Sequence, residues 1–171
     1  MGDALPYGVW ILLSALRLLL PAIAQLAGVI WRSYYPGIIS AEQIEYMLGW
    51  MYNLDTLQQE LANGTCFDRL LINNELAGFA SYGPVNEKMK LHKLYIHPQW
   101  QRRGLGTKLL GHVEQRARGQ GFLKLVLGVN KANERAIAAY RRNGFVIRES
   151  VTNEIGKGFV MDDYLMEKEL H

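Results

Sequence analysis

The chain has 171 residues, of which 49% are hydrophobic and 20% are charged, as in an ordinary globular domain with a sizeable core. Its net charge of +3 is too small to indicate nucleic-acid binding. Its single cysteine, Cys66, excludes a disulfide framework and a multi-cysteine metal site within one chain, so we expect a reducing compartment, the cytoplasm. No repeat or low-complexity linker divides the sequence, and residues 1–171 are predicted to form one domain.

The first thirty residues are unusually apolar. From Ala4 to Trp31 the only charged residue is Arg17, a pattern that is also found in membrane spans. Two prolines interrupt this run, and the chain lacks the basic start of a signal peptide. We therefore expect a buried strand near Tyr7–Leu13 and a helix near Pro21–Tyr34 in place of a membrane span.

Two more helices and a hairpin follow. Ser40 is placed to cap a helix, with Gln43 as its capping-box partner, and a shorter helix is expected over Asp55–Leu61. The next elements are strands over Arg69–Ile72 and Leu76–Tyr82, joined at Asn73-Asn74, with Gly83-Pro84 ending the second strand. The asparagine pair is typical of a tight hairpin turn, because asparagine tolerates the left-handed backbone that such turns need.

The second half of the chain alternates strands and helices. The predicted elements are strands over Met89–His97 and Phe122–Val129, helices over Leu105–Arg118 and Asn133–Arg142, and final strands over Phe145–Val151 and Phe159–Glu167. Phe122–Val129 is almost wholly apolar, which predicts a strand that is covered on both faces. The order of elements predicts an α/β (α+β) domain with a mixed sheet.

An anion-binding loop is predicted where the strand that ends at Pro98 leads into the next helix. The loop reads Gln101-Arg102-Arg103-Gly104-Leu105-Gly106-Thr107. Its glycines let the backbone turn N–H groups toward a ligand, and the helix start adds the positive end of its dipole. Residues 101–142 hold ten Lys or Arg against two acidic residues, which favours an anionic ligand. Other phosphate loops fit poorly, since Gly-x-x-x-x-Gly-Lys-Ser/Thr is absent and Leu109 replaces the third glycine of a dinucleotide fingerprint.

Two segments resemble the motifs of the GNAT superfamily, the GCN5-related N-acetyltransferases. Leu94–Pro98 followed by Gln101–Gly106 is similar to motif A, and Asn133–Phe145 is similar to motif B, in the family's order and spacing. The resemblance extends over residues 67–168. It implies a GNAT fold, with a mixed, mostly antiparallel sheet, a splay between the fourth and fifth strands, and about four flanking helices.

The resemblance also implies an N-acetyltransferase that uses acetyl-CoA as co-substrate. The residues expected to hold its pyrophosphate through main-chain amides are Gln101, Arg102, Arg103, Gly104, Leu105 and Gly106, with Thr107 adding its hydroxyl. Main-chain groups of Leu94 and Ile96 would pair with the pantetheine arm, which Asn133 would also contact. Tyr140 would lie beside the thioester sulfur and protonate the departing thiolate.

Simpler roles are open to two of these residues, and the general base is not identified. Asn133 is also well placed as an ordinary helix N-cap, and Tyr140 shares a helix face with Ala136 and Ile137, where it would be a core aromatic. The candidates for the base are His92, Tyr95, Glu45, Asp162, Asp163 and a chain of waters. The four histidines show no metal-ligand spacing, so no metal is expected.

The acceptor is expected to be a small-molecule amine or a protein N-terminus. The candidate substrate residues are Tyr34, Tyr35, Asp162 and Asp163, the two carboxylates because they would attract a cationic amine. Residues 127–140 resemble bacterial polyamine N-acetyltransferases, whereas the first 20 residues depart from the family pattern. The sequence leaves open a homodimer and two other functions: a sensor that binds acetyl-CoA without transferring the acetyl group, and an interaction module that uses the apolar N-terminus.

Overall fold

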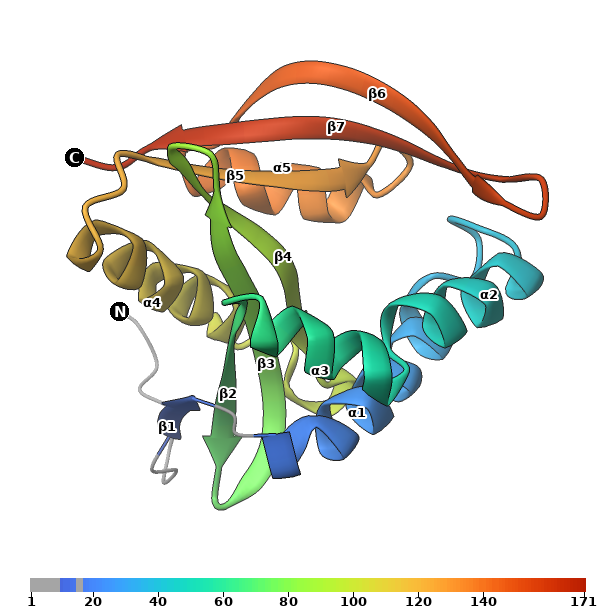
Figure 1. Cartoon of the computed structure of the whole chain (residues 1–171), viewed down its shortest axis with the longest axis horizontal. Coiled ribbons are helices and arrows are strands. Elements are labelled where there is room, and N and C mark those ends of the chain that lie inside the picture. The colour runs from blue at the N-terminus through green and yellow to red at the C-terminus, as the bar shows by residue number, and fades with distance from the viewer. Residues whose placement is uncertain (1–9, 15–16) are drawn as a thin grey trace.

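The structure is a computed structural model that describes residues 10–14 and 17–171, and one seven-stranded sheet runs through it (Figure 1). The strands are β1 (Trp10–Ser14), β2 (Cys66–Ile72), β3 (Glu75–Val85), β4 (Lys88–Ile96), β5 (Lys124–Asn130), β6 (Val146–Gly156) and β7 (Phe159–Glu169). The α-helices are α1 (Leu20–Tyr34), α2 (Ala41–Met51), α3 (Leu54–Ala62), α4 (Leu105–Gly119) and α5 (Glu134–Arg142). Two short 3-10 helices, Arg17–Leu19 and Pro98–Trp100, complete the elements described.

The sheet separates between two of its central strands. Its order is β1-β2-β3-β4-β5-β7-β6, and all neighbours are antiparallel except β4 and β5. These two pair in parallel over three residues each, Met89–Leu91 with Leu125–Leu127. Beyond Leu91, β4 continues along β3 and β5 along β7, so the two strands diverge (Figure 1). The predicted mixed, mostly antiparallel sheet with a splay between the fourth and fifth strands is confirmed.

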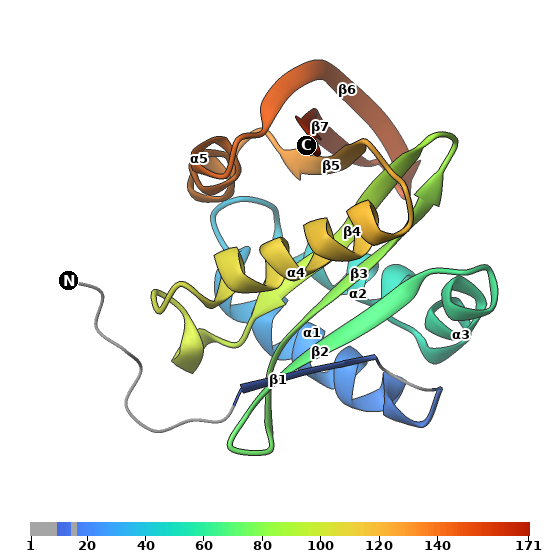
Figure 2. The same ribbon diagram turned by 90° about the vertical axis from the view of Figure 1, so that its left-hand side faces the viewer.

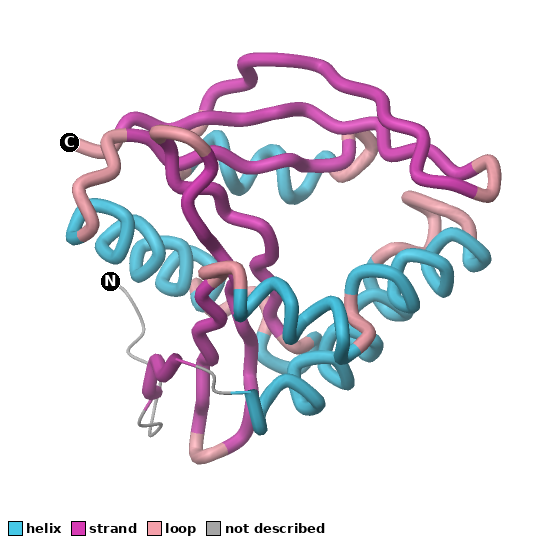
Figure 3. The backbone as a smooth tube through the Cα atoms, in the orientation of Figure 1, coloured by secondary structure: helices cyan, strands magenta, loops and turns pink. Residues whose placement is uncertain are grey.

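Helices cover both faces of the sheet, so the protein has two apolar clusters (Figure 3). On one face α4 lies across β3 and β4 (Figure 2) and buries Leu109 in the same cluster as Leu127 of β5. On the other face, α1, α2 and α3 pack around Phe79 of β3 and bury residues such as Ile23. The opening between β4 and β5 is therefore bordered by one cluster on each side.

The predicted hairpin turn and the predicted Ser40 cap both form. Asn73 and Asn74 both have left-handed backbones, with φ of +51° and +64°, so the hairpin turn between β2 and β3 is confirmed. The side-chain oxygen of Ser40 accepts from the main-chain N–H of Gln43 at 3.1 Å and so caps α2. The Gln43 side chain does not return to the cap, because its amide donates to the carbonyl of Val160 at 2.8 Å.

The predicted end of β3 is wrong. The strand continues through Gly83-Pro84 to Val85, and Pro84 lies opposite Met89 of β4. β2 has already ended, with Cys66 opposite Tyr82, so β3 is an edge strand at residues 83–85. On an edge strand, every second main-chain N–H group points away from the only neighbouring strand, which is why proline is tolerated there.

The prediction that the fifth strand is covered on both faces is also wrong. Leu125, Leu127 and Val129 of β5 are buried, whereas Gly128 is exposed on the opposite face. This second face borders the opening, and Gly128 lines the cavity described below.

The apolar N-terminus is described only in part. The predicted first strand corresponds to β1, which pairs antiparallel with β2, and residues 7–9 of that prediction lie outside the described residues. None of the helices in the described part of the chain is both long enough and apolar enough to cross a bilayer.

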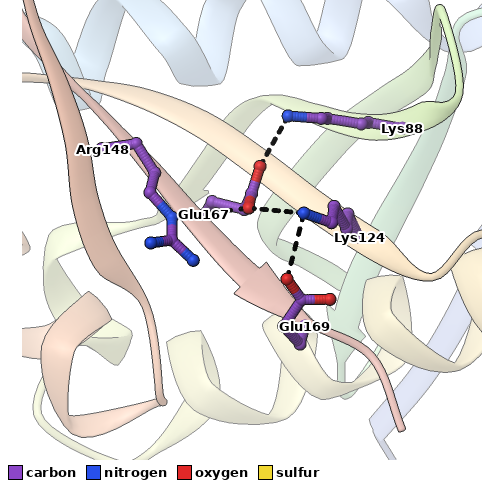
Figure 4. Close-up of polar contacts among 5 residues, drawn as sticks. All are labelled: Lys88, Lys124, Arg148, Glu167 and Glu169. Carbon is purple, nitrogen blue, oxygen red and sulfur yellow. Dashed lines mark hydrogen bonds and ion pairs between the residues drawn. The ribbon is translucent and has the colours of Figure 1, made fainter.

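A buried carboxylate holds the sheet together where β4 and β5 are still paired. Glu167 of β7 is 5% exposed, and its carboxylate lies 2.6 Å from Lys88 Nζ and 3.1 Å from Lys124 Nζ (Figure 4). Arg148 of β6 approaches the same group at 3.5 Å. One anion thus joins β4, β5, β6 and β7. Its hydrogen bonds from Lys88 and Lys124 hold the pKa of Glu167 below the ordinary value.

We predict that Glu167→Gln lowers the free energy of unfolding at pH 7 by about 1–3 kcal/mol, because it weakens hydrogen bonds to a desolvated carboxylate. A carboxylate with a lowered pKa in the folded state stabilises the fold above its unfolded pKa of about 4.3. That contribution is lost as the pH falls through the folded pKa. The difference between the variant and the wild type should therefore shrink below about pH 4, as measured by urea unfolding over a pH series.

Glu169→Gln is the matched control, because the Glu169 side chain is 43% exposed and forms its ion pair with Lys124, at 3.1 Å. It should cost less than about 1 kcal/mol. Equal losses for the two variants, or a loss for Glu167→Gln that does not change with pH, would contradict the role of Glu167.

Candidate active site

The loop predicted to bind an anion connects β4 to α4. The side-chain amide of Gln101 donates to the carbonyl of Ile96 at 3.0 Å and fixes the start of the loop. Arg102 and Gly104 then take left-handed backbone conformations, with φ of +61° and +72°. Among the described residues, no acceptor is found for the main-chain N–H groups of residues 102–107. The loop therefore presents a row of free donors at the positive end of a 15-residue helix, which suits a diphosphate.

One arginine of the loop points away from the cavity, whereas another arginine, from α5, reaches the loop. The guanidinium of Arg103 lies over the ring of Trp100, 4.9 Å from its centroid, and Arg103 does not line the cavity described below. Arg135 of α5 donates to the side-chain oxygen of Gln101 at 3.4 Å and lies over the ring of Tyr34. Arg135 was not predicted as a site residue, yet it brings positive charge to the loop from the other side of the opening.

A cavity of about 360 Å³ begins at this loop and follows the splay toward α1 and α2. Apart from Arg103, every residue predicted to bind the cofactor lines it: Leu94, Ile96, Gln101, Arg102, Gly104, Leu105, Gly106, Thr107, Asn133 and Tyr140. Because β5 leaves β4 after Leu91, no described strand pairs with the β5-facing edge of β4 at residues 92–96. An extended chain can add to such an edge through main-chain hydrogen bonds, as the predicted pantetheine contacts require.

Asn133 joins α5 to α1 across the opening. Its side-chain oxygen accepts from the main-chain N–H of Ala136 at 3.2 Å and from the hydroxyl of Tyr34 at 2.7 Å. The first bond makes Asn133 the N-cap of α5, which was the simpler of the two predicted roles. The second bond places Tyr34 beside the motif B segment. Contact between Asn133 and pantetheine stays a prediction.

Tyr140 lies on the cavity wall formed by α5, and its ring meets Phe145 edge-on at 5.6 Å between centroids. Burial raises the pKa of Tyr140 to about 12. Its hydroxyl therefore stays protonated at neutral pH and is available as a proton donor. The ring packs in the apolar cluster as well, so the core and catalytic roles that the sequence left open are compatible.

Aromatic residues form the cavity wall at the end near α1. The rings of Trp31 and Tyr35 stack at 4.3 Å between centroids, and the hydroxyls of Tyr35 and Tyr95 lie 3.3 Å apart. Burial raises the pKa of Tyr95 well above its ordinary value, and the same holds for Tyr35. Tyr95 is therefore a poor general base, although it lines the cavity as expected.

Two of the candidate bases have cationic partners outside the cavity wall. Both carboxylate oxygens of Glu45 accept from Arg32, at 2.7 and 2.8 Å. Asp162 is exposed and bonded to Lys131 and to Thr152, the latter at 2.8 Å. Neither carboxylate lines the cavity, so the structure does not bring them to the site.

Asp163 and His92 remain as candidate bases on the wall. Burial, followed by the nearby Asp162, raises the pKa of Asp163. Its side chain has no hydrogen-bond or ion-pair partner in the described part of the chain, and it points over Gly128, where an added Cβ would lie 3.5 Å from Oδ2. Partial burial, together with Lys90 and Lys93, lowers the pKa of His92 to about 4, which makes its imidazole a weak base.

Sequence reasoning missed several wall residues. Gly128 and Trp31 both line the cavity, as do Met47 and Met51 of α2. The isolated glycine in an apolar strand was a usable signal, because such glycines mark places where another group approaches closely. The helix residues gave no signal, since their spacing is that of ordinary core positions. Among the described residues, no group of three His, Cys, Asp or Glu is arranged to hold a metal.

Comparisons with known proteins agree with this geometry. The family described as Acetyltransferase (GNAT) family matches residues 28–145. A spermidine N(1)-acetyltransferase of Thermoplasma acidophilum is 26% identical over 148 residues, which cover 84% of this chain and 89% of that protein. A streptothricin acetyltransferase of Streptomyces lavendulae is 34% identical over 93 residues, covering 53% of this chain and 49% of the relative.

Solved structures show the same fold. The PaiA N-acetyltransferase of Thermoplasma acidophilum, in complex with coenzyme A, superposes with a TM-score of 0.79 and 25% identity, over 94% of this chain and 98% of that chain. The ribosomal-protein-S18-alanine N-acetyltransferase of Escherichia coli has a TM-score of 0.74 and 21% identity, over 95% and 94% of the two chains. The family match spans more than half of the sequence and contains the loop, the splay and α5. The chain therefore belongs to the acetyltransferase (GNAT) family and is an acyltransferase.

Proposed function

We propose that this protein transfers the acetyl group of acetyl-CoA to a primary amine by direct attack, with Tyr140 as the general acid and residues 1–171 acting as one N-acetyltransferase domain. One observation carries the proposal: a single cavity joins the free N–H groups of residues 102–107 to Tyr140 and to the carboxylate of Asp163. The coenzyme A complex of the PaiA protein supports the donor, and the spermidine acetyltransferase supports an amine acceptor.

The residues present fit acetyl-CoA at three points. The loop offers main-chain donors for a pyrophosphate, the edge of β4 at Leu94 and Ile96 offers main-chain groups for an amide-containing arm, and the cavity continues past Tyr140. Gly106 lies close to the ends of both strand side chains, with Leu94 Cδ2 and Ile96 Cγ1 each 4.0 Å from where its Cβ would be. The start of α4 is thus held against the end of β4. Acetyl-CoA, when bound there, supplies the activated acetyl group.

Two side chains of the cavity wall serve the two proton transfers of the reaction, one as acceptor and one as donor. An alkylammonium with an ordinary pKa of about 10.4 must lose a proton before its nitrogen can form the new C–N bond. Asp163, directly or through water, is the wall carboxylate that can receive this proton. Tyr140 donates its hydroxyl proton to the sulfur as the C–S bond breaks. Its pKa of about 12 keeps it in the acid form before that step.

A non-catalytic acetyl-CoA sensor is the alternative. The same loop and cavity would serve a sensor, whereas transfer also needs a proton donor beside the thioester, the role we assign to Tyr140 on the cavity wall. Thiol release with a panel of amines separates the two functions. Release of free CoA with any amine supports transfer, and tight acetyl-CoA binding without release for every amine supports the sensor.

We predict that Gly104→Glu abolishes acetyl-CoA binding. An added Cβ at residue 104 meets nothing within 4 Å, although the left-handed backbone (φ +72°) strains any side chain there, and the new carboxylate would repel a diphosphate bound at the loop. Binding would be measured by calorimetry. The control is Gly121→Glu, because Gly121 also has a left-handed backbone (φ +82°) and open space around its Cβ, at the other end of α4. Unchanged affinity in Gly104→Glu, or equal losses in both variants, would refute the loop assignment.

We predict that Tyr140→Phe keeps the acetyl-CoA affinity and lowers kcat by about 10²-fold, the lower range for loss of a general acid. The ring, and with it the packing on Phe145, is retained. Tyr164→Phe makes the same chemical change at another half-buried tyrosine that does not line the cavity, and its kcat should match that of the wild type. A normal kcat in Tyr140→Phe would show that solvent protonates the thiolate.

A further inference from the structure

Where the cavity lies between α1, α2 and β7 its wall is mostly apolar, with Gln43 and the hydroxyl of Tyr35 as polar groups. The wall residues are Trp31, Tyr35, Ile39, Met47, Met51 and Met161. Trp31 and Tyr35 stack on each other, and Tyr34 meets Tyr35 edge-on at 5.4 Å. These rings contribute apolar surface, and Met47, Met51 and Met161 add to it. This part of the cavity therefore suits a hydrocarbon surface.

One lining residue of this cavity carries a negative charge. Asp163 is the only carboxylate among the described residues that line it. It stands two residues from Met161 on β7, and alternate residues of a strand share a face, so both side chains face the α1–α2 cluster. The buried ammonium of Lys93 does not offset this charge, since both oxygens of Glu60 accept from it, at 2.8 and 2.6 Å. Lys131 and Lys90 act on Asp163 from a distance, Lys131 being paired with Asp162, and among the described residues no cation lies within ion-pair distance of the Asp163 carboxylate.

We propose that the acceptor is a primary monoamine with an apolar body, alkyl or arylalkyl, whose ammonium pairs with Asp163 and whose body lies against Trp31 and the methionines. This inference rests on the proposed function and names its substrate class. A polyamine would bring a second ammonium to a wall with no second carboxylate, and a desolvated, unpaired charge is strongly unfavourable. A peptide N-terminus would bring main-chain polar groups against Met47, Met51 and Met161, which offer no strong hydrogen-bond partner.

A pair of amines of equal size tests the inference. Heptylamine and 1,6-diaminohexane have the same number of heavy atoms, and they differ in one terminal group, methyl against ammonium. With the full chain and saturating acetyl-CoA, we expect kcat/KM for heptylamine to exceed that for the diamine by about tenfold or more. Spermidine should resemble the diamine. Equal or higher kcat/KM for the diamine, or acetylation of a peptide N-terminus alone, would overturn the inference and leave the transferase activity intact.

Two substitutions test whether Asp163 and the wall near Met161 determine the preference for a monoamine. Asp163→Asn should raise KM for heptylamine about tenfold and leave the acetyl-CoA affinity unchanged, because it removes the charge that pairs with the ammonium. Met161→Glu places a second carboxylate about 7 Å along β7 from Asp163, given the rise of a strand, and should shift the ratio of kcat/KM toward the diamine. Met161→Gln is the neutral control of the same size and should leave that ratio as in the wild type.

The variants test where the amine binds. An unchanged KM in Asp163→Asn, or an unchanged ratio in a folded Met161→Glu, would overturn the placement of the amine. The comparison of the two amines on the unmodified chain decides the substrate class even where Met161→Glu fails to fold. Absence of CoA release with every amine would instead refute the proposed function, and with it this inference.

Discussion

The separation of β4 from β5 is the constraint on which the site depends. Two strands that leave each other in the middle of a sheet expose main-chain N–H and C=O groups, which must find water or a ligand. The opening is stable because β4 and β5 are each held by another neighbour, β3 and β7, and because Glu167 ties the paired end. The same geometry that removes hydrogen bonds from the sheet creates an edge for an amide-containing arm to occupy.

The opening also connects the two faces of the protein. The anion-binding loop and α4 belong to one apolar cluster, whereas α1 and α2 belong to the other. A cavity that follows the splay therefore has a polar end with main-chain donors and a largely apolar end with one carboxylate. The bond from Tyr34 to Asn133 links α1 to α5 across this opening, so helices on both sides fix its width.

The sequence was most informative where function depends on the main chain. The loop Gln101–Gly106, the Asn73-Asn74 turn and the order of strands follow from local rules about glycine, asparagine and hydrophobic spacing. Side-chain partners were harder to predict, because they depend on elements far apart in sequence. Arg103 lies over Trp100 and not on the cavity wall, and Arg135 reaches Gln101 from α5. Pro84 stays within β3 because its neighbour β2 has ended, a fact of tertiary structure alone.

The pair Asp162 and Asp163 shows how strand geometry determines which side chains line the cavity. The sequence does not distinguish the two carboxylates, and their charge makes both of them candidates to attract a cationic amine. Their positions on β7 direct them to opposite faces, because side chains alternate along a strand. Asp162 is bonded to Lys131 and Thr152 in solvent, whereas Asp163 lies in the cavity over Gly128 with burial raising its pKa. A shift of one residue in the pairing of β7 with β5 would exchange the two, so the register of β7 determines which carboxylate is available to an amine.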